Sequence, residues 1–253
     1  MRYVVGIDGG GTKTKATVAD ETGNIVRSFA VGPLNLNGQD AGSVEQTLGH
    51  LLQITTEVCG GLDHCMQMCL GAAGISNPAV AERLTTLIRS GGYRGGLDLV
   101  GDHETALCGA LDRSIGMILI AGTGSICFGR NARGETHRTG GFGHLIDDEG
   151  SGYFIGRELL SAVVRAADGR SGPTAITELV YAQLEIDSVR QLIGFVYSKD
   201  TNKKDIAALA PLLSQACELG DSTALAIARR SAIALAELAA PVASRLALEE
   251  GEL

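Results

Sequence analysis

Residues 3–14 read Tyr-Val-Val-Gly-Ile-Asp-Gly-Gly-Gly-Thr-Lys-Thr, and this stretch decides the fold. The apolar run Tyr3–Ile7 predicts a buried strand that ends at Asp8. The three glycines then permit a tight turn into a second predicted strand, Thr14–Ala19. After a further turn the pattern predicts a third strand, Ile25–Ala30. Three antiparallel strands joined by short turns are therefore expected to open the chain.

The first of these turns has the composition of a phosphate-binding loop. Glycine tolerates positive φ and close backbone approach, so successive N–H groups can point at a phosphate. Thr12 and Thr14 add hydroxyl donors, and Asp8 can hold Mg²⁺ directly or through water. A strand follows the glycines rather than a helix, which excludes a Walker loop and a dinucleotide fingerprint. An ordinary hairpin turn is the alternative. The expected nucleotide contacts are Asp8, Gly9, Gly10, Gly11, Thr12, Lys13 and Thr14, with Asp8 also holding the metal.

A second strand–turn–strand of the same kind lies further along the chain. The predicted strand Gly116–Ala121 is followed by the turn Gly122-Thr123-Gly124-Ser125 and by the strand Ile126–Arg130. One such turn in isolation is more typical of a plain hairpin. Two of them, one in each half of the chain, could hold a polyphosphate from two sides. Gly122, Thr123, Gly124 and Ser125 are therefore predicted to bind the nucleotide.

The order of predicted elements indicates two related α/β halves with mixed sheets. The boundary falls near residue 115, which gives an N-terminal domain over 1–115 and a C-terminal domain over 116–253. The first half adds helices over Ala41–Cys59, Pro78–Arg89 and His103–Leu111, with Asn77 as an N-cap. In the second half a glycine-rich loop is expected over 136–150. Helices are predicted after it, over Ser151–Ala167, Thr174–Leu184, Ser188–Tyr197, Asp205–Leu219 and Asp221–Leu248.

Asp102 follows the predicted strand Leu97–Val100 directly and precedes a helix. Ligand-facing groups gather at the carboxyl ends of strands in open α/β sheets. A carboxylate there could take the proton of a hydroxyl that attacks a γ-phosphoryl group. It could equally cap the helix by accepting the N–H of Thr105. The position alone leaves both interpretations open.

The segment 140–152 combines flexible backbone, an aromatic ring and three consecutive carboxylates. Carboxylates bind vicinal sugar hydroxyls and an aromatic ring packs on the sugar, so a loop with Gly141, Phe142, Gly143 and the carboxylates Asp147, Asp148 and Glu149 has the ingredients of a sugar site. The alternative is an acidic helix start that the helix dipole favours. Asn35 and Asn37 follow Gly32-Pro33 and offer amide donors and acceptors that suit a sugar hydroxyl or an acetamide. A simple turn is the alternative for that segment.

Composition narrows the class of protein. The 253 residues carry 21 basic and 29 acidic side chains, a net charge of −8, which disfavours non-specific nucleic-acid binding. No run approaches the ~20 apolar residues that span a bilayer, and no signal peptide is recognisable. We therefore expect a cytoplasmic protein with six reduced cysteines. The group Asp63, His64, Cys65 and Cys69 lacks the second ligand pair of a zinc site.

Together these motifs resemble the BadF/BadG/BcrA/BcrD-type ATPases, and most closely their N-acetylglucosamine and glucosamine kinase branch. The resemblance covers residues 3–160 and implies an actin-like ATPase (ribonuclease H-like) fold around a cleft. It implies transfer from ATP with Mg²⁺ to an amino sugar, at the 6-hydroxyl. It also implies that Asp102 is the catalytic base, that Asp148 binds the sugar, that Thr12 and Thr123 contact ATP, and that one of Asn35 and Asn37 contacts the sugar.

The sequence departs from the family pattern at three places. Phe142 stands where the family has Trp, and Asp147 stands where it has Gly. Phe keeps an apolar face but loses the indole N–H, and Asp147 adds a charge beside Asp148. The family pattern also continues beyond the last predicted helix into a turn that packs on adenosine, and this sequence stops at Leu253 before it. The second half is therefore expected to be truncated, without the adenosine-binding end.

Two other functions compete with a kinase. The wider family includes ATPases that activate a redox partner through a cluster bridging two subunits, which would need cysteines at a dimer interface. Cys65, Cys69 and Cys108 fall in or beside predicted strands and helices, where they suit such a cluster poorly. A non-catalytic sugar or nucleotide sensor is the other alternative. An amino sugar is the expected small-molecule partner, and a homodimer is left open.

Overall fold

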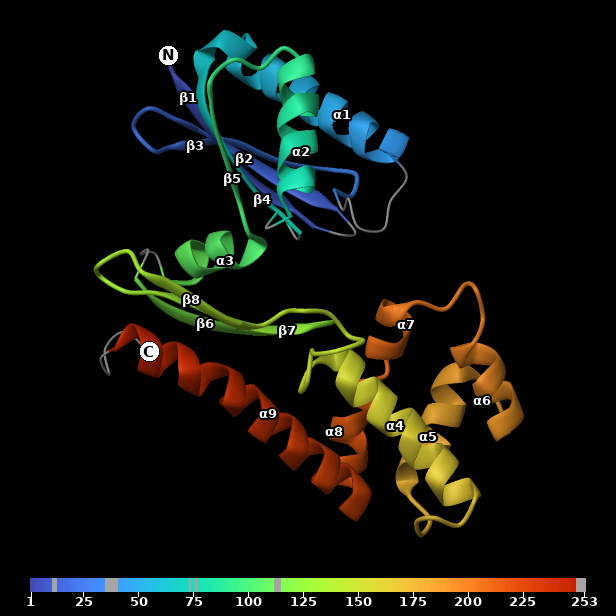
Figure 1. The fold of residues 1–253 in the computed structure, drawn as a ribbon. Helices are drawn as coiled ribbons and strands as arrows, with labels where there is room; N and C mark the ends of the chain where they lie inside the picture. The colour runs from blue at the N-terminus through green and yellow to red at the C-terminus, as the bar shows by residue number, and fades with distance from the viewer. Residues whose placement is uncertain (11–12, 35–40, 73, 76, 112–114, 249–253) are drawn as a thin grey trace. The chain divides into compact units, whose positions relative to one another are not determined.

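The computed structural model (Figure 1) describes residues 1–10, 13–34, 41–72, 74–75, 77–111 and 115–248. Gly11, Thr12, Asn35 and Asn37, which the sequence predicts as ligand contacts, lie outside the described residues. The chain divides into two compact units, Met1–Asp112 and Arg113–Leu253. The division lies close to the boundary expected near residue 115, and each unit has its own sheet and core.

The first unit is built on a five-stranded mixed sheet. The strands are β1 (Tyr3–Gly9), β2 (Thr14–Asp20), β3 (Ile25–Val31), β4 (Cys65–Ala72) and β5 (Gly96–Val100), in the order β3-β2-β1-β4-β5. β1, β2 and β3 form an antiparallel meander, whereas β4 pairs in parallel with both β1 and β5. The carboxyl ends of β1, β4 and β5 therefore meet at one edge of the sheet.

Helices cover both faces of this sheet. α1 (Ala41–Cys59) and α2 (Pro78–Ser90) share one apolar core with alternate residues of β1, β2 and β4, and a short 3₁₀ turn, η1 (Leu62–His64), leads into β4. Asn77 caps α2 as predicted, because its side chain accepts the N–H of Ala79 at 3.1 Å. α3 (Asp102–Leu111) contacts β1 and β4. Its Thr105 lies against Gly71, on the opposite face from the core.

The second unit has a three-stranded antiparallel sheet, β6 (Gly116–Ala121), β7 (Ser125–Arg130) and β8 (Thr136–Gly140). The expectation of a loop from residue 136 is wrong for its first five residues. β8 consists of Thr-His-Arg-Thr-Gly and has no apolar alternation to reveal it. Its strand is formed by pairing with β7 and by contact with the long helix α9 (Ser222–Leu246), where Thr139 donates to the carbonyl of Leu238.

The remaining helices pack into a second core around α4. They are α4 (Gly152–Ala167), α5 (Ala175–Leu184), α6 (Val189–Val196), α7 (Lys203–Ala207) and α8 (Pro211–Glu218). The single helix expected over 205–219 is wrong, because the chain forms α7 and α8 separately. Pro211 lacks the N–H that would continue the hydrogen-bond ladder and instead occupies the first turn of α8.

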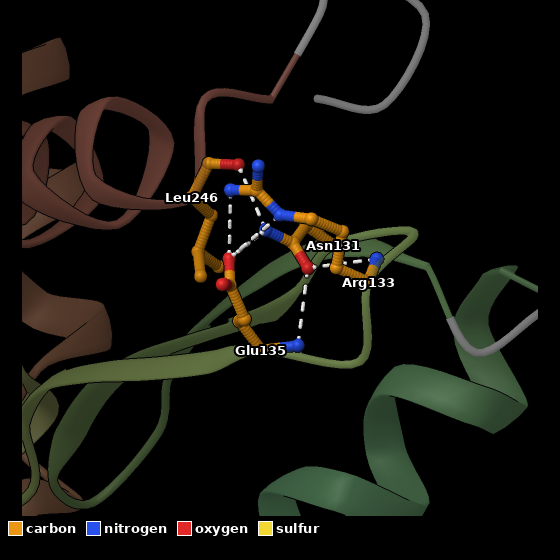
Figure 2. A network of polar contacts seen from close by, with 4 residues as sticks. All are labelled: Asn131, Arg133, Glu135 and Leu246. Atoms are coloured by element: carbon orange, nitrogen blue, oxygen red, sulfur yellow. Dashed lines mark hydrogen bonds and ion pairs between the residues drawn. The ribbon is translucent and has the colours of Figure 1, made fainter.

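A polar network ties the β7–β8 turn to the end of α9 (Figure 2). The side-chain amide oxygen of Asn131 accepts the N–H groups of Arg133 and Glu135, both at 3.0 Å. Its amide nitrogen donates to the Glu135 carboxylate at 2.7 Å and to the Leu246 carbonyl at 3.2 Å. The last carbonyls of a helix have no partner within the helix, so Asn131 satisfies one of them and holds α9 on the sheet.

Candidate active site

The first glycine-rich hairpin joins β1 to β2. The Gly10 carbonyl accepts the Leu34 N–H at 3.0 Å, and the Thr14 N–H donates to Gly32 at 3.1 Å. A Cβ on Gly9 would lie 3.0 Å from the Cβ of Ala72, so neighbouring strands leave room only for glycine. The turn is thus held close against the β3 end and β4 by backbone contacts.

Asp8 and Thr14 have opposite surroundings in this hairpin. The Asp8 side chain is exposed and makes no hydrogen bond or ion pair with any described residue. Thr14 is fully buried, yet its hydroxyl has no hydrogen-bond partner among the residues that the structure describes. None of the Asp8 carboxylate lone pairs is therefore used by a described residue.

Asp102 is the first residue of α3, and its side chain is 53% exposed. The capping bond to Thr105 does not form, because the Thr105 and Glu104 N–H groups donate to the Gly101 carbonyl. One Asp102 oxygen instead accepts the N–H of His103 at 3.0 Å. A hydrogen bond from the His103 side chain lowers the pKa of Asp102, with a smaller contribution from the His103 N–H. Asp102 is consequently ionised at neutral pH and open to solvent.

Asp8 and Asp102 lie at the same edge of the sheet. Asp8 is level with Gly71 of β4, which is level with Val100 of β5. Adjacent strands are about 4.8 Å apart, so the backbones of Asp8 and Val100 are roughly 10 Å apart. Asp102 follows Val100 by two residues. The first unit thus presents two carboxylates at the carboxyl edge of its parallel strands, where ligands bind in open α/β sheets.

In the second unit, the N-terminus of α4 supports the turn between β6 and β7. The Gly152 N–H donates to the Gly122 carbonyl at 2.8 Å, and the Tyr153 N–H donates to the Thr123 carbonyl at 3.2 Å. Ser151 caps the helix by accepting the Phe154 N–H. The N–H groups of Thr123 and Gly124 make no hydrogen bond with the described residues. These two N–H groups are therefore the donors that the turn can offer to an anion.

Asp148 lies directly on this turn. It is 4% exposed, has a left-handed φ of 69°, and accepts the Ser125 N–H at 3.2 Å. A Cβ on Gly124 would come within 2.8 Å of its carboxylate, so the contact requires glycine there. The Ser125 hydroxyl donates to the Glu149 carbonyl at 2.8 Å. A residue predicted to bind the sugar and a turn predicted to bind phosphate are thus in direct contact. The positive φ of Asp148, which is rare outside glycine, is typical of functional sites.

Phe142 and Asp147, the two loop residues that depart from the family pattern, contact each other. The Phe142 N–H donates to the Asp147 carboxylate at 2.8 Å, so Asp147 closes the loop that carries the aromatic ring. Gly141 and Gly143, on either side, have φ values of 75° and 99°. The Phe142 ring is 61% exposed, with the Arg138 guanidinium carbon 4.6 Å from its centroid. Asp147 is therefore a loop-shaping residue, which its position in the sequence did not indicate.

Sequence reasoning missed a hollow of about 540 Å³ beside the second turn. Its polar side consists of Gly122 and Thr123, the start of α4 and Lys204 of α7. Its apolar side comes from α7, α8 and α9 and consists of Ala207, Ala208, Ala210, Pro211 and Leu235. The run of small residues around Pro211 is the signal in the sequence, but only the fold brings it next to the turn.

Among the described residues, no group of three or more His, Cys, Asp or Glu side chains is placed to hold a metal ion. Mg²⁺ in nucleotide sites is commonly held by one or two carboxylates together with phosphates and water. The exposed Asp8 carboxylate beside the first turn fits that requirement. In the same part of the chain, no helix is long and apolar enough to cross a membrane.

The sheet order and the two glycine-rich hairpins define an actin-like ATPase fold. A glucokinase of the ROK family from Streptomyces griseus, solved with glucose and AMPPNP, shares this fold at a TM-score of 0.55 and 19% identity, covering 96% of this chain and 80% of its own. A structure from Chromobacterium violaceum, provisionally described as an N-acetylglucosamine kinase, superposes at a TM-score of 0.80 and 26% identity over 94% of this chain and 82% of its own.

Residues 5–253 match the BadF/BadG/BcrA/BcrD ATPase family, and the chain belongs to it. An N-acetylmuramic acid/N-acetylglucosamine kinase from Clostridium acetobutylicum is 36% identical over 233 residues, covering 92% of this chain and 76% of that protein. An N-acetyl-D-glucosamine kinase from Dictyostelium discoideum is 29% identical over 98% of this chain and 81% of its own. The resemblance that the sequence motifs carry is therefore confirmed.

Proposed function

We propose that this protein is an ATP-dependent kinase that phosphorylates N-acetylglucosamine or glucosamine at the 6-hydroxyl. Three relatives that match over most of the chain are named as kinases of these amino sugars. The observation that carries the proposal is the contact between Asp148 and Gly124. It joins a carboxylate suited to sugar hydroxyls to a turn suited to phosphates, which is the pairing that phosphoryl transfer to a sugar needs.

Asp102 is the general base in this proposal. Its ionised carboxylate accepts the proton of the sugar hydroxyl as that oxygen bonds to the γ-phosphorus. The bond between the γ-phosphorus and the β–γ bridging oxygen breaks, and ADP leaves with the electron pair. In phosphoryl transfer, catalysis is mostly positioning and charge stabilisation, so a base of modest strength is sufficient.

The phosphate-binding groups follow from the two hairpins. The N–H groups of Thr123 and Gly124 donate to phosphate oxygens, and the first hairpin, from Gly9 to Thr14, provides further backbone and hydroxyl donors. Asp8 would hold Mg²⁺, which would neutralise charge on the phosphates. The base of the nucleotide occupies the apolar side of the hollow formed by α7 and α8, where small side chains leave a flat space.

The sugar-binding groups come from the loop 141–148. The second carboxylate oxygen of Asp148 has no hydrogen-bond partner among the described residues and accepts sugar hydroxyls. The exposed Phe142 ring packs against the apolar face of the sugar. Asn35 or Asn37 adds an amide contact to the substrate. Because Asp148 is held by the Ser125 N–H, its position does not depend on the substrate.

A redox-activating ATPase is a weaker candidate. Cys59 and Cys65 are buried, and burial raises the pKa of the Cys65 thiol, and that of Cys59 to about 11. Iron is bound by thiolates, so these thiols are poorly prepared for a cluster. A homodimer and a cytoplasmic location stay predictions.

A coupled assay of ADP release tests the proposal. Purified protein is supplied with MgATP and, in turn, N-acetylglucosamine, glucosamine, glucose or no sugar, and the phosphorylated product is identified by mass spectrometry and NMR. We expect sugar-dependent ADP release with an amino sugar and a 6-phosphate product. ADP release that is the same with and without sugar would instead indicate an ATPase, and the proposal would be abandoned.

A further inference from the structure

Arg138 is a cation without a counter-ion in the described part of the chain. Arg133, Arg170 and Arg230 each pair with a carboxylate at 2.5–2.8 Å. Arg138 makes no ion pair or hydrogen bond with any described residue, although it is half-buried. Its guanidinium carbon lies over the Phe142 ring, 4.6 Å from the ring centroid. An arginine that is partly removed from water with only an aromatic ring beside it, and no anion, is unusual and points to an anionic ligand.

The position of Arg138 ties it to the sugar loop. It lies on β8 opposite Phe128 of β7, and paired residues of an antiparallel ladder point to the same face. The residue before Phe128 in β7 is Cys127, which points to the opposite face and packs with Val242 and Leu246 of α9. Arg138 therefore faces away from α9, and the loop begins two residues later at Gly140.

The stacking contact fixes the guanidinium without using its hydrogen-bond donors. A guanidinium stacked on a ring keeps its five N–H groups in its own plane, where they can form two parallel bonds to a carboxylate. The nearest acidic residue in the loop, Asp147, is engaged with the Phe142 N–H. The side chain is thus oriented to bind an anion that none of the described residues supplies.

We propose that Arg138 binds a carboxylate carried by the sugar substrate, so that the site accepts amino sugars with an acidic substituent as well as neutral ones. This inference rests on the proposed kinase function. A phosphate of ATP is a poorer candidate for the same arginine. Arg138 lies level with Phe128, three residues along β7 from Ser125. At about 3.3 Å per residue, that is roughly 10 Å from the phosphate-binding turn.

Steady-state kinetics with a matched pair of substrates tests the assignment. N-acetylmuramic acid is N-acetylglucosamine with a lactyl ether that ends in a carboxylate, and its methyl ester has nearly the same shape without the charge. For Arg138→Gln we expect kcat/KM to fall about 100-fold with the acid, as for loss of a charge-assisted bidentate contact, and at most about threefold with the ester or with N-acetylglucosamine. Arg138→Lys should restore part of the loss with the acid only.

Arg165→Gln is the matched control, because it makes the same change of net charge at an exposed arginine of α4. It should leave all three substrates unaffected. An equal loss with acid, ester and N-acetylglucosamine would mean that Arg138 only orients Phe142 or contacts the phosphoryl group. Wild-type protein that phosphorylates N-acetylglucosamine but neither phosphorylates nor binds the acid would also overturn the assignment.

Calorimetry separates this inference from the kinase proposal. The acid and its methyl ester are titrated into wild-type protein and Arg138→Gln without ATP. Tighter binding of the acid that disappears in the variant supports Arg138 even if no sugar is phosphorylated, in which case only the kinase proposal fails. Equal affinities of wild type and variant for the acid would overturn the assignment whether or not the kinase reaction occurs.

Discussion

Thr14 and Ser125 occupy equivalent positions in the two glycine-rich hairpins, since each begins the strand that follows the turn. Both are buried, at 0% and 2% exposure. The Ser125 hydroxyl donates to the Glu149 carbonyl, whereas the Thr14 hydroxyl has no partner among the described residues. The same sequence pattern thus has two different surroundings. In the second turn the buried hydroxyl is hydrogen-bonded within its own unit, and in the first no described residue bonds to it.

The carboxylates of Asp102 and Asp148 also differ in how far their own unit buries and holds them. Asp102 is exposed at a helix start and accepts a hydrogen bond from its neighbour His103, whereas Asp148 is buried and accepts the Ser125 N–H. A base must give and take a proton, so solvent access suits it. A group that fixes a substrate benefits from rigid support. The proposed mechanism therefore places the base in the first unit and the carboxylate that fixes the sugar in the second.

Of the substitutions that test this comparison, Asp102→Asn should have the largest effect on activity. Loss of a general base should lower kcat by about 10²- to 10⁴-fold while KM for the sugar changes little, because the amide keeps the shape of the side chain. Initial rates over a range of sugar concentrations measure both. Asp98→Asn is the control, since Asp98 is an exposed carboxylate on β5, the strand that precedes Asp102, and it accepts a hydrogen bond from the Gln67 side chain. Normal turnover by Asp102→Asn would refute the assignment.

Gly124→Ala tests the contact between the second turn and Asp148. The added methyl group would lie 2.8–3.0 Å from the Asp148 carboxylate, which must move. Misplacement by about 1 Å can cost roughly 100-fold, so we expect KM for the sugar to rise between about 10- and 100-fold, more than kcat falls. Gly172→Ala is the control, because a Cβ there meets no atom within 4 Å. An unchanged KM would show that Asp148 does not contact the sugar.

Ser125→Ala and Thr14→Val compare the buried hydroxyls of the two hairpins, and they should have the smallest effects. Ser125→Ala removes a buried hydrogen bond and should lower the free energy of unfolding by about 1 kcal/mol. Thr14→Val removes a buried hydroxyl that has no partner, so it should be neutral or stabilise by up to about 1 kcal/mol. Urea titrations of each variant against wild type measure the difference. Equal losses in the two variants would mean that Thr14 has a structural partner.

Local patterns in the sequence were sufficient for most elements. Apolar runs located the strands β1 and β6, and Asn77 with Pro78 located the start of α2, because period and capping depend on neighbouring residues. The glycines of both hairpins were found for the same reason. The family resemblance came from these same short motifs.

Other features depend on contacts between distant parts of the chain. β8 exists because β7 and α9 offer partners to a polar segment, and the hollow exists because α7 and α8 return to the β6–β7 turn. The contact of Asp148 with Gly124 and that of Arg138 with Phe142 also depend on the tertiary fold. Sequence alone determined which residue types are present and which local structures they favour. Tertiary structure decided which of them touch, because burial and hydrogen bonding act between atoms that the chain order does not bring together.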